Sequence, residues 1–272
     1  MPEGHTIHRL ARDLAELSGH EVRASSPQGR FADGAARLDG AHVRQPDAWG
    51  KHLFVLTDEG PHLHVHLGMH GKFLRSNDPG RPPLAQARLR LSTADVAWDL
   101  VAPSTCELLT EAQASRVVGT LGPDPLRDDA DRDAALRAIR ATPRPVGAVL
   151  LDQSVLAGVG NVFRNEALHE LGVHPATAAR DLSEDQVGRL WEVLRRMMAQ
   201  AVEDGRIVTV QAPDRLAVPE AEARHVYKQQ QCRDCGAPVE VVQIGGRTAY
   251  VCPTEQPAPP ASHPATSTTG AA

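Results

Sequence analysis

The sequence contains few cysteines and lacks both a long apolar run and a leader segment. Four Cys among 272 residues argue against a disulfide framework and favour metal or thiol chemistry in a reducing compartment. No apolar run is long enough to cross a bilayer. The N-terminus has neither the basic nor the apolar region of a signal peptide, which predicts a cytoplasmic protein.

The chain also lacks an excess of positive charge. Its formal net charge is -5, and acidic residues cluster at Asp124, Asp128, Asp129, Asp131 and Asp133. A nucleic-acid-binding surface would therefore have to be a local basic patch on an acidic protein. Neither an internal repeat nor a phosphate-binding glycine loop stands out.

The length and the changing residue pattern predict an α+β protein with more than one domain. Residues 1–120 begin with a helix and continue as short segments separated by Gly, Pro, Asp and Asn, which is typical of an antiparallel β-sandwich. A Gly/Pro/Asp-rich linker at Gly119–Asp129 separates them from a helical domain, 121–205. Its clearest helix is Ser183–Asp204, with Ser183 and Gln186 as a capping box and Gly205 as its end.

Three segments follow the helical domain. Residues 206–224 have no clear period and are predicted to form a connecting loop. Residues 225–256 have the pattern of a zinc-type β-hairpin. Residues 257–272 are rich in Pro, Ala, Ser and Thr, which predicts a disordered tail.

The hairpin segment carries the strongest local signal for a metal. Cys232 and Cys235 form a CxxC knuckle, and Cys252 follows a hairpin-like stretch, as in zinc ribbons. The fourth ligand is expected at position 255, where the residue is Glu255. Three thiolates and a carboxylate can hold one structural zinc ion, and the alternative fourth ligands are His225 and His263. A hairpin that has lost its metal is a further alternative.

The first four residues suggest a nucleophile. Removal of the initiator methionine would leave Pro2 with a free secondary amine, and an α-amino group has a pKa of about 7.7–8.0. Such an amine forms an iminium ion on attacking a sugar carbon. Helical spacing from Ile7 to Leu17 puts Pro2 and Glu3 at a helix start, where the dipole disfavours protonation of the amine and Glu3 is placed to shuttle protons. The alternative is that Pro and Glu simply suit the first turn of a helix.

Two other patterns have competing interpretations. His62, His64 and His66 alternate along one strand and share one face, so they predict either a metal site or a His-rich solvent face. Asn161 follows a GVG turn at a helix start, where backbone N–H groups favour an anion such as phosphate. Lys51, after Trp49-Gly50, is by itself only a charge at the start of a strand.

These pieces, in this order, resemble the Fpg/Nei (formamidopyrimidine-DNA glycosylase / endonuclease VIII) family of DNA repair enzymes. The resemblance covers residues 1 to about 256 and favours the endonuclease VIII-like branch. It is carried by the MPEG start, GKHLF around Lys51, LGMHGKF around Met69, QSVLAGVGNVFRNEAL at Gln153–Leu168, and the hairpin VYKQQQCRDC…GGRTAYVCP.

The resemblance implies a β-sandwich domain joined to a helix–two-turns–helix domain with a zinc hairpin, and damaged DNA in the cleft between them. Pro2 corresponds to the Schiff-base nucleophile, Glu3 to the proton donor and Lys51 to the lysine that assists β-elimination. The implied activity is a bifunctional DNA glycosylase and abasic-site lyase of base excision repair, acting on oxidised bases, pyrimidines above all.

The resemblance also implies how DNA is held. Lys51, Asn161 and Arg247 correspond to phosphate-contacting residues, and Arg247 also to one that assists δ-elimination. Met69 resembles a residue that fills the gap left by an extruded nucleotide. The expected partner is damaged double-stranded DNA, with single-stranded or bubble DNA as a further option, bound by a monomer at the bacterial nucleoid.

Two other functions compete with this one. The first keeps the fold without the chemistry, as a protein that binds DNA damage and does not cut it. The second is a β-barrel metalloenzyme that uses His62, His64 and His66 and has an unrelated zinc ribbon.

Overall fold

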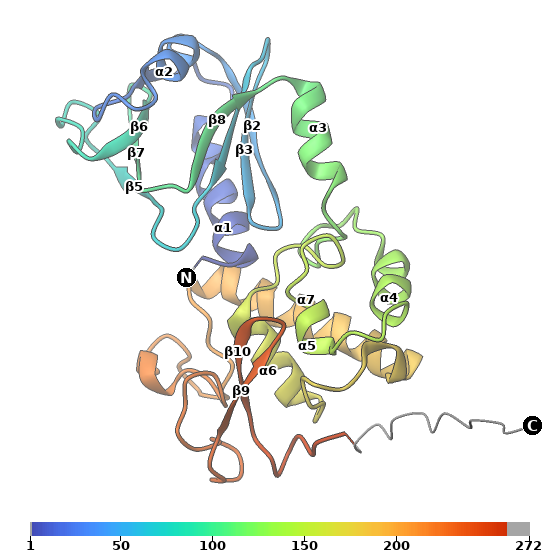
Figure 1. Cartoon of the computed structure of the whole chain (residues 1–272). Coiled ribbons are helices and arrows are strands. Elements are labelled where there is room, and N and C mark those ends of the chain that lie inside the picture. Colours follow the sequence, from blue (N-terminus) through green and yellow to red (C-terminus); the bar gives the residue numbers. More distant parts are fainter. Residues whose placement is uncertain (1, 260–272) are drawn as a thin grey trace, which may run out of the picture.

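The computed structural model describes residues 2–259, so His263 and the tail beyond 259 lie outside it. Figure 1 shows two lobes, one of strands with α1 and one of helices with a protruding hairpin. No described helix combines the length and the apolarity that a membrane span requires. The first lobe holds α1 (Gly4–Leu14), β1 (Arg23–Ser25), α2 (Ala32–Leu38), β2 (Val43–Trp49), β3 (His52–Thr57), β4 (His62–His66), β5 (Lys72–Ser76), β6 (Ala87–Ser92), β7 (Ala97–Val101), β8 (Thr105–Leu109) and α3 (Glu111–Gly119).

The strands form two four-stranded antiparallel sheets, which confirms the predicted sandwich. Their orders are β1-β6-β7-β5 and β2-β3-β4-β8. Leu53, Val65 and Leu100 are fully buried between the sheets. They belong to one core with Ile7, Leu10 and Leu14 of α1, because these residues share a helix face at 3.6-residue spacing.

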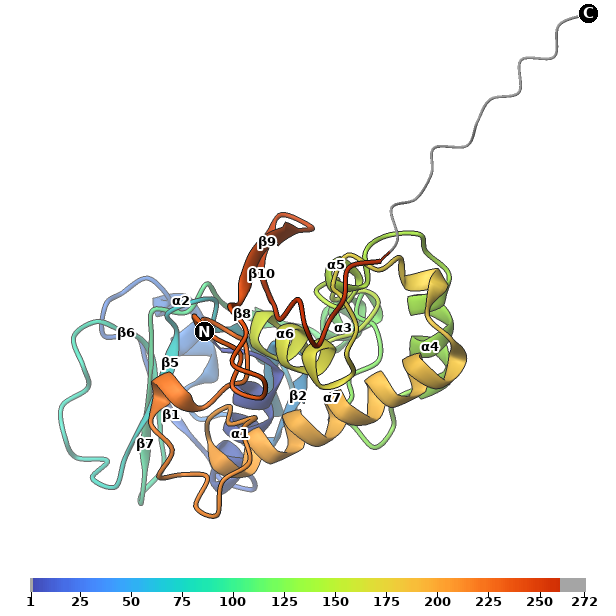
Figure 2. The same cartoon turned by 90° about the horizontal axis from the view of Figure 1, so that it is seen from below.

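The second lobe is helical and is organised around its longest helix. It contains α4 (Arg132–Arg140), α5 (Val146–Val149), α6 (Asn161–Glu170) and α7 (Glu184–Asp204). Ser183 and Gln186 form the predicted capping box of α7, and Gly205 ends the helix in a left-handed conformation. Figure 2 shows α7 running along one edge of the helical lobe, and the helix contacts α1, α4 and α6.

The C-terminal hairpin packs along α6. Its strands are β9 (Glu240–Ile244) and β10 (Arg247–Val251). The Thr248 carbonyl accepts a hydrogen bond from Asn161 Nδ2 at 3.0 Å, and Tyr250 N donates to Asn165 Oδ1 at 2.8 Å. Because both partners lie on α6, the hairpin and the helix are held side by side. The predicted domain limits remain predictions, and α3 ends at Gly119 while α4 begins at Arg132.

The two lobes meet where three glycines bring backbones into contact. Gly4 N donates to Gly158 O at 2.8 Å. A Cβ on Gly4 would lie 2.8 Å from Gly158 Cα, and one on Gly50 would lie 2.9 Å from Gly158 N. Any side chain at Gly4 or Gly50 would therefore push the start of α1 or the β2–β3 turn away from the helical lobe.

Candidate active site and metal centre

Glu3 is the most buried acidic residue near the N-terminus, and it caps a helix of the other lobe. Its carboxylate accepts hydrogen bonds from the backbone N–H groups of Gly160 at 3.1 Å, Val162 at 2.9 Å and Phe163 at 3.4 Å. These groups belong to the first turn of α6, whose unpaired donors favour an acidic partner. The side chain next to Pro2 is thus held rigidly at the junction of the lobes.

The protonation of Glu3 reflects two opposing effects. Complete burial raises the pKa of its carboxyl above the usual value, because the charged form loses its hydration. The three backbone donors and the Lys51 ammonium oppose this shift without reversing it. Glu3 therefore keeps a proton to higher pH than an exposed glutamate, which is the property required of a proton donor near neutral pH.

Lys51 extends from the turn between β2 and β3 toward the start of α6. Its Nζ donates a hydrogen bond to the Val159 carbonyl at 2.7 Å. Burial lowers the pKa of Lys51, the Arg247 charge lowers it further, and the carboxylate of Glu3 opposes both. The charges of Glu3 and Arg247 are therefore close enough to Lys51 to shift its pKa. Lys51 loses its proton more readily than an ordinary lysine, as a group that accepts a proton must.

Asp124 supports the turn that carries Lys51. The carboxylate is fully buried and accepts from Gly50 N at 2.6 Å and Leu126 N at 2.9 Å, while His8 Nε2 donates to it at 2.7 Å. One carboxylate thus joins α1, the β2–β3 turn and the linker between the lobes.

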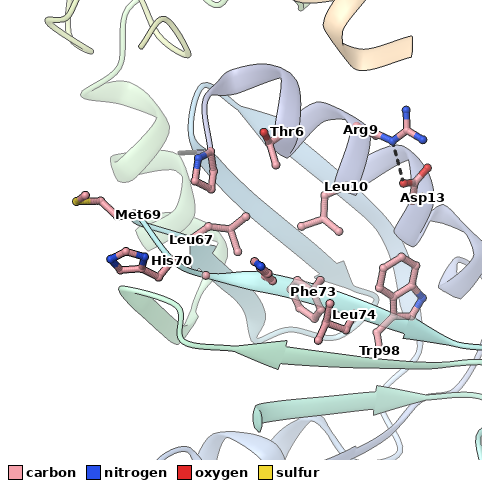
Figure 3. Close-up of a pocket in the computed structure, with 13 residues that line it drawn as sticks. Thr6, Arg9, Leu10, Asp13, Leu67, Met69, His70, Phe73, Leu74 and Trp98 are labelled. Carbon is pink, nitrogen blue, oxygen red and sulfur yellow. Dashed lines mark ion pairs between the residues drawn. The ribbon is translucent and has the colours of Figure 1, made fainter. Parts of the chain in front are cut away.

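Pro2 lines a cavity of about 440 Å³ between α1 and the β5 region. Figure 3 shows Met69 and His70 at one end of this cavity, and Trp98 with the Arg9–Asp13 ion pair at the other. The Met69 side chain is 63% exposed. Pro2 forms part of the cavity wall. The cavity also has an apolar floor, formed by Leu10, Leu67, Phe73, Leu74 and Trp98.

Asn161 and Arg247 lie on the two elements that the hairpin contact joins. Asn161 is the first residue of α6, as predicted, and is partly buried against Thr248. Arg247 begins β10 and is exposed. Arg164, fully buried one turn into α6, donates to the Thr248 carbonyl at 2.6 Å and to Gly147 O at 3.3 Å. It therefore fixes the hairpin against α6 and α5.

A group of thiol and imidazole side chains capable of holding a metal lies between α6 and the hairpin. The ligand atoms of His169, Cys232 and Cys252 all lie within 4.8 Å of one another, and all three residues are buried. Cys235 Sγ is 3.4 Å from Cys252 Sγ. The structure thus brings Cys232 and Cys252 together as predicted, and it places Cys235 beside Cys252 but outside the group of mutually close ligand atoms. Glu255 is exposed and is not a member of this group.

Comparisons with known proteins agree with this arrangement. Residues 1–101 match the family model for the formamidopyrimidine-DNA glycosylase N-terminal domain, and residues 121–212 match that for the H2TH domain. Endonuclease 8 1 of Mycobacterium tuberculosis is 40% identical over 267 residues, which cover 94% of this chain and all of the relative. The chain belongs to the formamidopyrimidine-DNA glycosylase family.

Other relatives of the family support the assignment. Probable endonuclease 8 2 of Streptomyces coelicolor is 34% identical over 95% of each chain. The fold matches that of Lactococcus lactis formamidopyrimidine-DNA glycosylase, solved bound non-covalently to DNA containing an AP site. The TM-score is 0.76 at 21% identity, and the match covers 94% of this chain and all of that one. Enzymes of this family are DNA glycosylases with AP lyase activity in base excision repair.

Within this glycosylase fold the strand histidines have structural partners. His62 and His64 are each 4% exposed. His62 Nε2 lies 2.7 Å from a carboxylate oxygen of Glu111 on α3, and His64 Nδ1 lies 2.9 Å from one of Glu107 on β8. The expectation of a His-rich solvent face was wrong, because α3 packs over this sheet. Among residues 2–259, no candidate metal group includes His62, His64 or His66.

Several residues that organise the glycosylase site were not singled out for such a role from the sequence. Asp124 was seen only as part of an acidic cluster. Gln153 accepts from Gly158 N and donates to Val159 O, each at 3.0 Å, and so shapes the turn before α6. No comparable sequence signal marked Arg164 and His169, because α6 is buried on all sides from Val162 to His169 and shows no separate apolar face.

Proposed function

We propose that this protein excises oxidised bases from DNA and nicks the resulting abasic site through a covalent intermediate on Pro2. The supporting observation is that Pro2 lines a cavity, while its neighbour Glu3 and Lys51 both bind backbone groups at the start of α6. Only a nucleophile, a proton donor and a proton acceptor together make both steps possible.

The reaction begins at the sugar that carries the damaged base. Glu3 delivers a proton to the sugar-ring oxygen, and the ring opens as the neutral Pro2 nitrogen attacks C1′. The bond to the base then breaks with its electron pair on the base, which takes up the N–H proton of Pro2, and the freed nitrogen lone pair forms an iminium ion with C1′. The iminium acidifies C2′, so a base can remove a proton there. The electron pair forms the C2′–C3′ double bond and expels the 3′ phosphate.

Lys51 is placed to act in the elimination. Its lowered pKa leaves it able to accept a proton, and its ammonium form can contact the departing phosphate. While the iminium persists, a second elimination can follow, in which a proton leaves C4′ and the electron pair expels the 5′ phosphate; Arg247, exposed on β10, would neutralise that phosphate. Water then hydrolyses the iminium and releases Pro2.

The cavity beside Pro2 would accept part of the extruded nucleotide. A base inside a duplex must be rotated out of the stack, at a cost of a few kcal/mol that falls when pairing is already poor. The exposed Met69 at the rim of the cavity would fill the vacated space. The apolar floor suits a planar ring, and oxidised pyrimidines are the proposed substrates.

DNA would lie across the junction and be held by its phosphates. Lys51, Asn161 and Arg247 come from three different elements near the start of α6. Phosphate contacts of this type fix the position of the protein on the DNA without reading its base sequence. Lactococcus lactis formamidopyrimidine-DNA glycosylase, of the same fold, has been solved with DNA containing an oxidised pyrimidine. We place the enzyme, as a monomer, in the cytoplasm on nucleoid DNA.

We also propose that the hairpin holds one structural zinc ion through Cys232, Cys235 and Cys252. Thiolates are the usual ligands of structural zinc, and the ion would supply cross-linking rather than chemistry. With the metal bound, the cross-link would hold the hairpin that carries Arg247 in one conformation. Three cysteines leave one coordination position to be filled.

Borohydride trapping on a duplex with one abasic site tests the reaction. Reduction of the iminium should give a stable protein–DNA adduct with the native chain. A chain carrying one extra residue before Pro2 is the matched control, because the Pro2 nitrogen is then an amide and should give no adduct. Glu3→Gln should slow release of a damaged base more than trapping at a preformed abasic site.

Other outcomes would reject the proposal. Tight binding to the abasic duplex without an adduct would make this a damage-binding protein. An adduct that persists in the N-terminally extended chain would identify a lysine, with Lys51 first, as the nucleophile.

A further inference from the structure

His169 faces the cysteine cluster from the last turn of α6. Its Nε2 lies 3.3 Å from Cys232 Sγ, and the histidine side chain is 4% exposed. Helix α6 begins at Asn161, so the imidazole reaches the hairpin from a different element of the fold. A ring nitrogen at this distance from a buried thiol is placed either to donate to it or to share a metal with it.

The spacing of the side chains suits a shared metal. Tetrahedral zinc with Zn–S near 2.3 Å and Zn–N near 2.0–2.1 Å separates its ligand atoms by about 3.6–3.8 Å. The observed separations are 3.3 Å for His169 with Cys232 and 3.4 Å for Cys235 with Cys252. Cys235 is not part of the group whose ligand atoms all lie within 4.8 Å of one another, so its side chain has to turn inward for all four residues to surround one ion.

The second nitrogen of His169 is also suitably placed. Nδ1 lies 3.7 Å from a carboxylate oxygen of Asp234, inside the CxxC knuckle. Metal-bound histidines usually direct their other N–H toward a carboxylate or carbonyl, which orients the ring. Asp234 also accepts from His225 Nδ1 at 2.8 Å, so its position is constrained from a second side.

Glu255 does not compete for the same position. Its side chain is exposed, and only its backbone N–H turns inward, toward Cys252 Sγ at 3.5 Å. The turn after Cys252 thus keeps the form of a knuckle, while the carboxylate that replaces the expected thiol points to solvent.

We infer that His169 is the fourth ligand, so that the hairpin zinc is bound by Cys232, Cys235, Cys252 and His169. The metal then cross-links the hairpin to α6 through coordination bonds. The inference rests on the proposed zinc hairpin but not on the DNA chemistry, so it can fail or succeed independently of base excision. The position that Glu255 leaves empty is filled from another domain.

Metal binding by the full-length protein tests the assignment. The measurements are zinc content by mass spectrometry, competition with a chromophoric chelator, and the visible spectrum of the Co²⁺-loaded protein. His169→Ala should weaken zinc binding more than about 100-fold, since even partners outside the ligand set cost 10–100-fold. Glu255→Gln is the matched control and should change neither the affinity nor the Co²⁺ spectrum.

A rescue variant separates ligation from folding. His169→Cys offers a thiolate from the same helix position and should restore one zinc per chain, with the Co²⁺ bands shifted toward those of an all-thiolate site. Loss of zinc in Glu255→Gln with retention in His169→Ala would overturn the inference. So would a native chain without zinc, or a Co²⁺ spectrum unchanged by His169→Cys.

Discussion

At the scale of single residues, the side chains proposed to transfer protons lie in surroundings that disfavour their usual charged form. Glu3 is buried under the first turn of α6, and Lys51 is half-buried against the Val159 carbonyl. The pKa of the acid is raised and that of the base is lowered. Each group is thereby brought closer to the pH at which it must exchange a proton.

The raised pKa of Glu3 predicts the alkaline side of the pH profile. The rate of base release should fall as pH rises through that pKa, because the proton donor is lost. Single-turnover rates from pH 5 to 10 measure it, and Glu3→Gln should show a lower rate without this fall. Glu59 is the control, since its side chain is exposed and does not line the Pro2 cavity, and Glu59→Gln should leave the profile unchanged.

The same shift affects stability. The folded chain keeps the Glu3 proton to higher pH than the unfolded chain. Its free energy of unfolding should therefore decrease from about pH 4.5 up to the folded-state pKa of Glu3 and then level off, as far as this residue contributes. Urea titrations that show no difference in slope between the native chain and Glu3→Gln over this range would contradict the assignment.

At the scale of elements, helix α6 holds the site together. Its N-terminus binds Glu3, its buried face carries Arg164, and its last turn presents His169. It is ten residues long, about 15 Å. Glu3, the proposed proton donor, and the group of His169 and cysteines proposed to bind zinc therefore lie at opposite ends of one helix.

Gly160 gives a test of the contact between Glu3 and α6. A Cβ at Gly160 would lie 2.2 Å from the Glu3 carboxyl carbon, so Gly160→Ala should displace Glu3. We expect a loss of stability of about 1–3 kcal/mol, as for other overpacked sites, and at least 100-fold slower base release. Gly119→Ala is the control, because a Cβ there contacts nothing within 4 Å. Equal effects of both changes in urea unfolding and single-turnover assays would reject the explanation.

The elements also show what sequence patterns can reveal. The helix of Ser183–Asp204 and the start of α6 at Asn161 were predictable, because capping residues and periodic apolar residues act locally. Strand β2 runs through Pro46 to Trp49, where a proline would be expected to end a strand, because Pro46 lies on an edge strand near a bulge. Helix α2 was missed for lack of a side-chain cap.

At the scale of the whole molecule, the lobes are linked by groups far apart in the sequence. His8 and the backbone N–H of Gly50 both form hydrogen bonds to the carboxylate of Asp124. Arg127 forms an ion pair with Asp47 at 2.7 Å. The motifs and the order of the domains could be read from the sequence. The convergence on Asp124 and the approach of His169 to the cysteines could not, because they depend on tertiary packing without local periodicity.

Asp124 gives the prediction that belongs to this scale. Asp124→Ala leaves the Gly50 N–H buried without a partner, which should cost about 1–3 kcal/mol of stability and misplace Lys51. Strand nicking should fall more than binding to an abasic duplex. Asp128→Ala is the control, since that side chain is fully exposed and lies 3.9 Å from Arg195. Nicking reduced equally in both variants would exclude a positioning role for Asp124.

The position of Pro2 on the cavity wall has a consequence for how the protein is made. Under the proposed mechanism, a chain that keeps Met1 is an inactive precursor, because the nitrogen of Pro2, the proposed nucleophile, is then part of a peptide bond. Removal of Met1 would activate it. The specific activity of any preparation should therefore scale with the fraction of chains that begin at Pro2, which intact-mass measurement reports directly.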